Sequence, residues 1–325
     1  MKEGSNISSE GFRKRHRKTL TIVLTVVGLL IAVFLIHIIG VENIVRSFSS
    51  YTSYQIALFV TLYVLSWVLR GLKFYLILRA SNIDISAPRS VGLAILGGFA
   101  NIFGTFQIGD VTRVIAVKFQ AKKDFGVATS PILTDMLSGT YGLITLVLTF
   151  ILIFGPNGTG FWTALCLIFL VLLAIATVGV LKYGQQIGDF LSSRSSKKVL
   201  SFLANIVYTM RRALNNKLFY MSIVISYISW LIEGISFSFL VPSVDWYNAV
   251  IAEALGNMVK IIPVTPGGIG TFEGIVALYL SRFGLDISQA FSYALSYHLM
   301  TKVILAIIGA PLASILIPKD TKSST

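Results

Sequence analysis

The stretch from Phe161 to Leu181 reads FWTALCLIFLVLLAIATVGVL and carries no charged side chain. An α-helix needs roughly 20 mainly apolar residues to cross the hydrocarbon core of a bilayer, and this stretch meets that length. The whole chain agrees with it, because 55% of its 325 residues are hydrophobic and only 13% are charged. A soluble domain with that balance would expose large apolar patches. The sequence therefore predicts an all-α integral membrane protein.

Seven further apolar runs surround this stretch. Five are long enough to span a bilayer, namely Thr19–Val41, Tyr54–Leu78, Pro131–Phe154, Leu218–Val241 and Gln289–Ile317. Two others, Val91–Gln107 and Ala249–Leu280, are interrupted by glycine and proline, which at membrane depth is typical of broken or re-entrant helices. We expect about six full transmembrane helices and two broken segments. The number of passes is six to eight, depending on whether the broken segments cross.

Lysine and arginine are distributed unevenly between the loops. They form the run 13–18, flank one edge of the second and third spans, and fill the loop 182–217, whereas loops 155–160 and 242–248 contain none. Positively charged loops stay in the cytoplasm, so the net charge of +13 indicates topology rather than a nucleic-acid partner. We expect a cytoplasmic basic segment 1–18, one transmembrane domain 19–317 and a cytoplasmic tail 318–325, in the cell membrane.

This orientation holds only if each broken segment enters and leaves the membrane on the same side. The first would enter from the cytoplasm and the second from outside. The order span, broken segment, span then occurs twice with opposite orientation, which is an inverted repeat. Broken helices at corresponding positions of inverted halves mark the central site of many transporters. The first half accordingly offers four candidate headgroup residues, Asn101, Gly109, Asp110 and Arg113.

Two helical stripes of polar residues run through predicted spans. One contains Ser222, Ser226, Ser229, Glu233 and Ser236, and the other contains Asp135, Ser138, Gly142, Thr145 and Thr149. The stripes either line a hydrophilic path or let two helices pack closely through small side chains. Charged groups inside a span are costly and usually face a cavity or a partner, so we take Asp135 and Glu233 as cavity residues.

The run PVTPGGIGTFEG at 263–274 is the strongest local signal. Its prolines and glycines end one helix, and another begins near Thr271. Free amides at a helix start bind anions, which suits a lipid phosphate. Glu273 either caps these amides or contacts the substrate or a proton. The candidate residues here are Pro266, Gly267, Gly268, Gly270 and Glu273.

Further charged residues are spaced to share helix faces. Glu253, Asn257 and Lys260 lie on one face, and His298 and Lys302 lie on another. Because opposite charges at membrane depth attract, we expect Lys302 to pair with Glu273 or Glu253, and Asp110 to pair with Arg113. Arg70 and Lys73 are expected to extend to the cytoplasmic interface.

The loop 182–217 contains an amphipathic stretch, Val199–Leu214, beside Arg211 and Arg212. Such a helix lies on anionic headgroups, unless the loop is merely solvated. No metal site is expected, because His16, His37 and His298 are scattered and Cys166 is the single cysteine. No cofactor is expected either, since the glycines at 267–270 do not follow a β-strand or the dinucleotide pattern.

These residues give the chain a resemblance to the lysylphosphatidylglycerol synthase transmembrane-region family, also called flippase-like domain proteins. The resemblance covers roughly Thr19 to Ile317 and rests on PVTPGGIGTFEG, with support from Asn101, Gly109, Asp110 and Arg113. Phe106-Gln107 stands where the family commonly has a proline, and Asp110 replaces a more usual glutamate. Known members join this module to a cytosolic aminoacyl-transferase domain, for which residues 318–325 offer no counterpart.

The resemblance implies a lipid translocase that moves a phospholipid or another phosphate-headgroup lipid. Two alternatives stay open. One is an intramembrane enzyme, although no nucleophile and base or metal constellation supports catalysis. The other is an accessory subunit of phospholipid or glycolipid modification, which docks a soluble transferase through the basic loop 182–217. Membrane lipids are the expected partners, and a homo-oligomer is compatible with the sequence.

Overall fold

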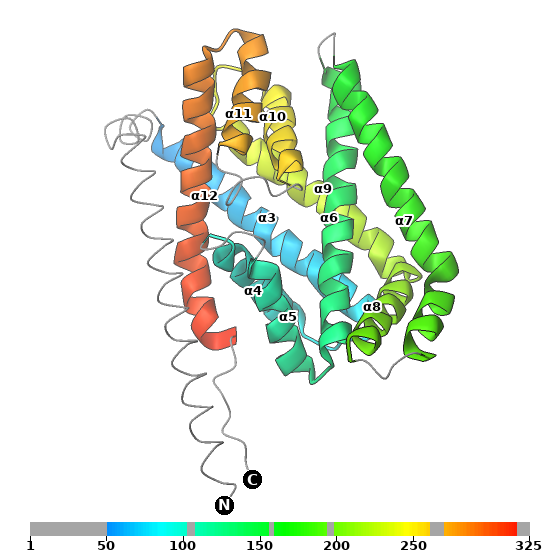
Figure 1. Ribbon diagram of the computed structural model, residues 1–325. Coiled ribbons are helices and arrows are strands. Elements are labelled where there is room, and N and C mark those ends of the chain that lie inside the picture. Colours follow the sequence, from blue (N-terminus) through cyan, green and yellow to red (C-terminus); the bar gives the residue numbers. More distant parts are fainter. Residues whose placement is uncertain (1–50, 103–107, 156–158, 194–197, 261–269, 317–325) are drawn as a thin grey trace, which may run out of the picture.

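A computed structural model describes residues 51–102, 108–155, 159–193, 198–260 and 270–316. Within these ranges the chain is helical and contains no strand (Figure 1). The first expected span, Thr19–Val41, the segment 1–18 and the tail 318–325 lie outside the described residues. The helices are α3 (Ser53–Ala80), α4 (Ala87–Ala100), α5 (Ile108–Ala121), α6 (Phe125–Phe154), α7 (Gly160–Ser193), α8 (Lys198–Leu214), α9 (Lys217–Ser238), α10 (Trp246–Val259), α11 (Thr271–Leu280), the 3-10 turn η2 (Ser281–Phe283) and α12 (Ile287–Leu316).

Five of these helices, α3, α6, α7, α9 and α12, are long and apolar enough to cross a membrane. They confirm five of the six predicted spans. The helix α7 continues to Ser193, well beyond the predicted end at Leu181, because its last turns pack on α8 at Gly184 and Gly188. The protein is a helical integral membrane protein with several passes.

The helix α7 shows how the outer surface meets lipid. Its apolar side chains are largely exposed, with Ile168 at 57%, Ile175 at 64% and Val178 at 58% exposure. Exposed aliphatic residues in such density would favour aggregation in water. In a bilayer they contact acyl chains at no cost, so α7 forms part of the lipid-facing wall.

The first broken segment is a hairpin of α4 and α5. Helix α4 runs antiparallel to α3, because Val91 lies against Gly71 while Gly98, two turns further on, lies against Trp67. Helix α5 returns beside α4, with the Gly109 backbone against Gly97, where a side chain on either glycine would collide. The expected broken segment Val91–Gln107 is therefore longer at both ends, from Ala87 to Ala121.

The second broken segment is a hairpin of α10 and α11. Near its tip, Gly256 of α10 lies against Phe272 of α11. At its base, the Tyr279 hydroxyl donates a hydrogen bond to Asn248 Oδ1 at 3.4 Å. The base also lies at the end of α6, because Phe154 stacks on Tyr247 with ring centroids 4.9 Å apart.

The two hairpins open at opposite ends of the molecule (Figure 1). Helix α6 begins directly after the base of the first hairpin and ends beside the base of the second. The helix contacts repeat as well, because α3, α4, α5 and α6 contact one another in the same order as α9, α10, α11 and α12. Helix α4 also contacts α12, as α10 contacts α6. This arrangement is the inverted repeat that the sequence predicts.

The polar stripes of α6 and α9 face each other. The hydroxyls of Ser138 and Ser222 are 2.8 Å apart, and Gly142 leaves no room for a side chain beside Ser226. The indole Nε1 of Trp230 donates to the Gly139 carbonyl at 3.1 Å. The small residues of these stripes therefore take part in close helix packing, which is one of the two predicted interpretations.

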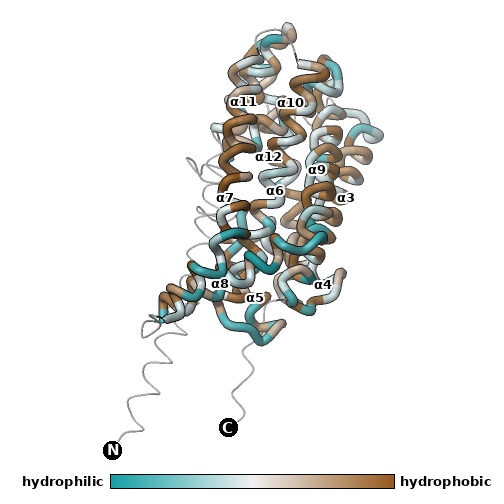
Figure 2. Tube along the Cα trace, turned by 90° about the vertical axis from the view of Figure 1, so that its right-hand side faces the viewer, coloured by the Kyte–Doolittle hydropathy of each residue, from teal (hydrophilic) through white to brown (hydrophobic). Residues whose placement is uncertain are grey.

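Hydrophilic positions gather at one end of the molecule, around α8 and α5 (Figure 2). Helix α8 crosses this end and packs on α6 and α7, where Gly126 and Gly188 allow close approach. Its predicted apolar face stays accessible, with Val199 at 65% and Leu203 at 39% exposure. That exposure is what a helix in the headgroup region requires.

Candidate functional site

A buried ionic cluster joins three helices of the first half. Asp135 of α6 accepts from Arg113 of α5 at 2.7 Å and lies 3.0 Å from Lys73 of α3. Arg113 also pairs with Asp110 at 3.1 Å, as the sequence predicts, and its guanidinium lies 4.0 Å from the ring centre of Phe74. Two acids and two bases balance here, so the cluster needs no external charge.

Asn101 and Gly109 complete the tip of the first hairpin. The Gly109 amide donates to the Asn101 side-chain oxygen at 2.7 Å. Because Gly109 stands in the first turn of α5, this bond satisfies an amide that the helix itself leaves free. The predicted first-half residues thus come together, with Asn101 holding the start of the helix that carries Asp110 and Arg113.

A second ion pair links α3 to α9. Arg70 donates to Glu233, and its guanidinium lies 3.9 Å from the ring centre of Trp230 and 5.2 Å from that of Trp67. An arginine between two indoles gains cation–π attraction in addition to the ion pair. Glu233 also accepts from the Tyr297 hydroxyl at 3.1 Å.

Tyr297 of α12 brings two carboxylates together. Its hydroxyl lies 3.1 Å from Glu233 and 3.0 Å from Glu253 of α10. Asn257 donates to Glu253, and Lys260 donates to the Asn257 side-chain oxygen at 3.1 Å. The predicted face of Glu253, Asn257 and Lys260 is therefore a continuous hydrogen-bonded chain that leads to the tip of the second hairpin.

The start of α11 is organised by Glu273. Its carboxylate accepts from the Gly270 amide at 2.7 Å, and Gly270 has a φ of +83°, a conformation that glycine adopts without strain. The other carboxylate oxygen lies 2.5 Å from His298 Nδ1. Glu273 thus caps the helix, as one of its two predicted roles requires, and also holds His298 in place. Pro266, Gly267 and Gly268 lie outside the described residues.

Two lysines near this hairpin tip have no acid in contact. Within the described ranges, neither Lys260 nor Lys302 has a carboxylate within 4.0 Å. Lys302 lies near enough to oppose the positive charge of Lys260, which Glu253, Glu273 and Glu233 favour from beyond contact distance. Glu273 and Glu233 likewise favour the charge of Lys302. Lys260 rests over the Phe272 ring at 3.9 Å, and among the described residues His298 Nε2 is buried without a hydrogen-bond partner. Two ammonium groups held together in this way are suited to bind an anion.

One predicted pairing and one predicted side-chain placement are wrong. Lys302 pairs with neither Glu273 nor Glu253, because His298, one turn earlier on α12, is nearer to Glu273. Arg70 and Lys73 do not extend to an interface either, since both face acids inside the bundle.

Three residues of the site were not predicted from the sequence to belong to it, which are Arg70, Lys73 and Tyr297. The signal for Arg70 and Lys73 was present, because both stand inside a predicted span, where a charge indicates a partner. Tyr297 gives no such signal, since a tyrosine in an apolar helix is common.

The fold and the site define a polytopic membrane protein with a buried ionic core between two opposed helical hairpins. The chain belongs to the family described as lysylphosphatidylglycerol synthase TM region, whose profile matches residues 21–309. It is also similar to the UPF0104 membrane protein MJ1078 of Methanocaldococcus jannaschii, at 24% identity over 153 residues. That match covers 46% of this chain and 62% of the archaeal protein, so the chain spans somewhat less than two thirds of this relative.

Proposed function

We propose that the protein moves a lipid with a phosphate-containing headgroup across the bilayer. The observation that carries the proposal is the pair Lys260 and Lys302 near the tip of the second hairpin, two ammonium groups that no acid of the described residues contacts. A lipid phosphate between them would replace repulsion with two charge-assisted hydrogen bonds. Membership of the family supports a role in membrane lipid handling.

The opposed hairpins support movement rather than simple binding. The hairpins open at opposite ends of the molecule (Figure 1), and polar contacts link α3, α9, α10 and α12. Opening one hairpin while the other stays closed would expose the lysine pair to alternate sides, which is how inverted repeats permit alternating access.

The charge distribution supports a cytoplasmic position for the end that carries α8. This end holds Arg211, Arg212 and the basic α5–α6 turn (Figure 2), and basic segments stay in the cytoplasm. In the cell membrane, its anionic headgroups would then attract α8. A soluble transferase that docks at the same end is the accessory-subunit alternative.

A scrambling assay with purified protein in liposomes tests the proposal. Vesicles carry a labelled tracer of phosphatidylglycerol, aminoacylated phosphatidylglycerol or an isoprenoid-phosphate glycolipid. Dithionite or an enzyme added outside then measures the fraction of tracer that is accessible in the outer leaflet. Wild type should accelerate the exchange of at least one lipid. Lys302→Gln should slow it by about ten- to a hundredfold, because a charge-assisted hydrogen bond contributes about 1.5–3 kcal/mol.

Lys217→Gln is the matched control. It removes the same charge from an exposed position at the start of α9, so its exchange rate should equal that of wild type. If no tracer moves in wild-type vesicles, translocation is rejected and the accessory-subunit alternative is favoured. If Lys302→Gln and Lys217→Gln move lipid equally fast, the lysine pair is not the headgroup site.

A further inference from the structure

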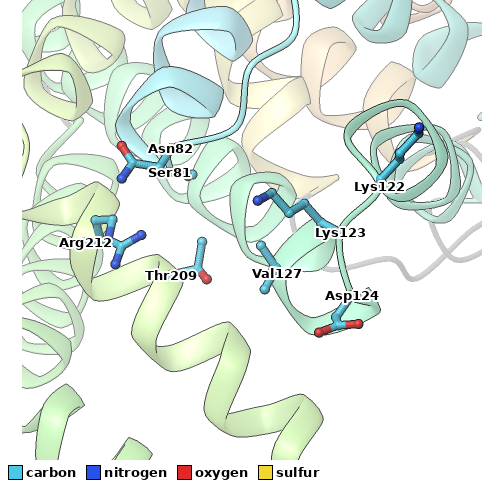
Figure 3. Close-up of a pocket in the computed structure, with 8 residues that line it drawn as sticks. All are labelled: Ser81, Asn82, Lys122, Lys123, Asp124, Val127, Thr209 and Arg212. Atoms are coloured by element: carbon cyan, nitrogen blue, oxygen red, sulfur yellow. The ribbon is translucent and has the colours of Figure 1, made fainter.

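A second cationic site lies at the end of the molecule that carries α8, away from the hairpin tips. Here a pocket of about 510 Å³ opens where three segments meet, the end of α3, the turn between α5 and α6, and one face of α8 (Figure 3). That volume is within the range of small-ligand sites. Its lining residues are Ser81, Asn82, Lys122, Lys123, Asp124, Val127, Thr209 and Arg212.

The charge of this pocket is positive after all its neighbours are counted. Lys122, Lys123 and Arg212 contribute three positive charges and Asp124 one negative charge. The carboxyl ends of α3, α5 and α8 each add about half a negative charge, and the amino end of α6, directly after Asp124, adds about half a positive charge. A net positive charge of about one remains.

The polar groups of the pocket are available to a ligand. None of its three cations belongs to an ion pair in the part of the chain that the structure describes. Ser81 is 2% exposed, and its hydroxyl has no hydrogen-bond partner among the residues that the structure describes. A buried hydroxyl without a partner is costly unless a ligand or water satisfies it. Asp124 precedes α6 without capping it through its side chain, so amides of the first turn remain free.

The pocket joins elements that belong to different parts of the fold. Lys123 ends the first hairpin, Ser81 ends α3, and Arg212 belongs to α8. The side chains of Lys123 and Arg212 point into the space between these segments (Figure 3). An anion that contacts both would tie α8 to the base of the hairpin and hold this end of the bundle together.

We infer that this pocket binds the phosphate of an anionic headgroup, with Lys123 and Arg212 as charged donors and Ser81 as a neutral donor. The helix that supplies Arg212 keeps an apolar face accessible for the bilayer surface, so the pocket lies where lipid phosphates are found. The same chemistry would accept a soluble phosphate ester, and the experiment separates the two sources. The inference does not depend on lipid translocation.

Ligand-induced stabilisation of the detergent-solubilised protein tests the inference. The ligands are short-chain phosphatidylglycerol, short-chain phosphatidylcholine and sn-glycerol 3-phosphate, each titrated while Tm is followed. Phosphatidylglycerol should raise Tm, and phosphatidylcholine, which has no net charge, should raise it far less. If glycerol phosphate acts at the same concentration as phosphatidylglycerol, the ligand is a soluble ester; if acyl chains are needed, it is a lipid.

Variants decide whether the effect arises in the pocket. Arg212→Gln and Lys123→Gln should each weaken the apparent affinity about ten- to a hundredfold. Lys198→Gln removes the same charge from an exposed site on α8 outside the pocket and should leave the affinity unchanged. Lys302→Gln removes a charge from the proposed translocation site, so a stabilisation that persists in Lys302→Gln and is lost in the pocket variants arises in this pocket.

Three outcomes would overturn the inference. One is equal stabilisation by phosphatidylglycerol and phosphatidylcholine. The second is an unchanged response in both Arg212→Gln and Lys123→Gln, whose Tm without ligand shows that they are folded. The third is a response that disappears in Lys302→Gln but persists in the pocket variants, which would assign the anion to the hairpin site.

Discussion

The two halves of the inverted repeat carry ionic groups that are arranged differently. In the first half, Asp135 lies between Lys73 and Arg113, and Arg113 has Asp110 as a second acid. In the second half, Glu253 and Glu273 bind neutral donors and a histidine, and no acid of the described residues contacts Lys260 or Lys302. The first half thus holds acids and bases in direct contact, and the second half holds two lysines that lack such contacts among the described residues. We interpret the first cluster as a lock between helices and the lysines as the place where an anionic ligand binds.

Asp135→Asn should have the largest effect, because it breaks the first cluster. Removal of the acid leaves Lys73 and Arg113 close together and buried, at 7% exposure each. An unpaired buried charge typically costs about 3–5 kcal/mol, so Tm in detergent should fall steeply. The control is Asp84→Asn, which removes an acid from the exposed pair with Arg79 and should change Tm little. Equal Tm values for the two variants would contradict the interpretation that the Asp135 cluster holds the helices together.

Lys302→Gln sharpens the comparison from the other side. Because it removes repulsion with Lys260 and breaks no contact ion pair of the described residues, it should keep or raise Tm while lipid exchange falls about ten- to a hundredfold. A thermal melt and the scrambling assay on the same preparation provide both values. A large loss of stability would show that Lys302 stabilises the fold and that its charge is already compensated within the protein.

Gly142→Ala tests the close packing of α6 on α9, which holds the two halves together. The added methyl group would collide with Ser226 and the neighbouring backbone, and such overpacking typically costs about 1–3 kcal/mol. Gly179→Ala in α7 is the matched control, since no atom lies within 4 Å of its added methyl group. We expect Tm to fall for Gly142→Ala only. An unchanged Tm would mean that α6 and α9 can move apart to accommodate the methyl group.

The sequence predicted the helices well, because hydrophobic length and glycine or proline breaks are local properties. It also predicted the pairs that lie within one turn, such as Asp110 with Arg113, since helical spacing alone places them together. Pairs between helices were not predictable in this way. Arg70 reaches Glu233, 163 residues further on, only because α3 packs along α9, and no spacing rule encodes that contact.

Ser138→Ala should have the smallest effect. It measures how much a hydrogen bond between the polar stripes of α6 and α9 contributes to stability. Its hydroxyl bonds the Ser222 hydroxyl at 2.8 Å, yet hydrogen bonds between membrane helices average only about 0.6 kcal/mol. Alanine keeps the helices at the same distance, because it is no larger than serine. Tm should therefore fall slightly, well below the change for Gly142→Ala, with lipid exchange unaffected. If exchange instead falls as far as in Lys302→Gln, the serines line the path of the headgroup, and the small residues of α6 and α9 act in transport as well as in packing.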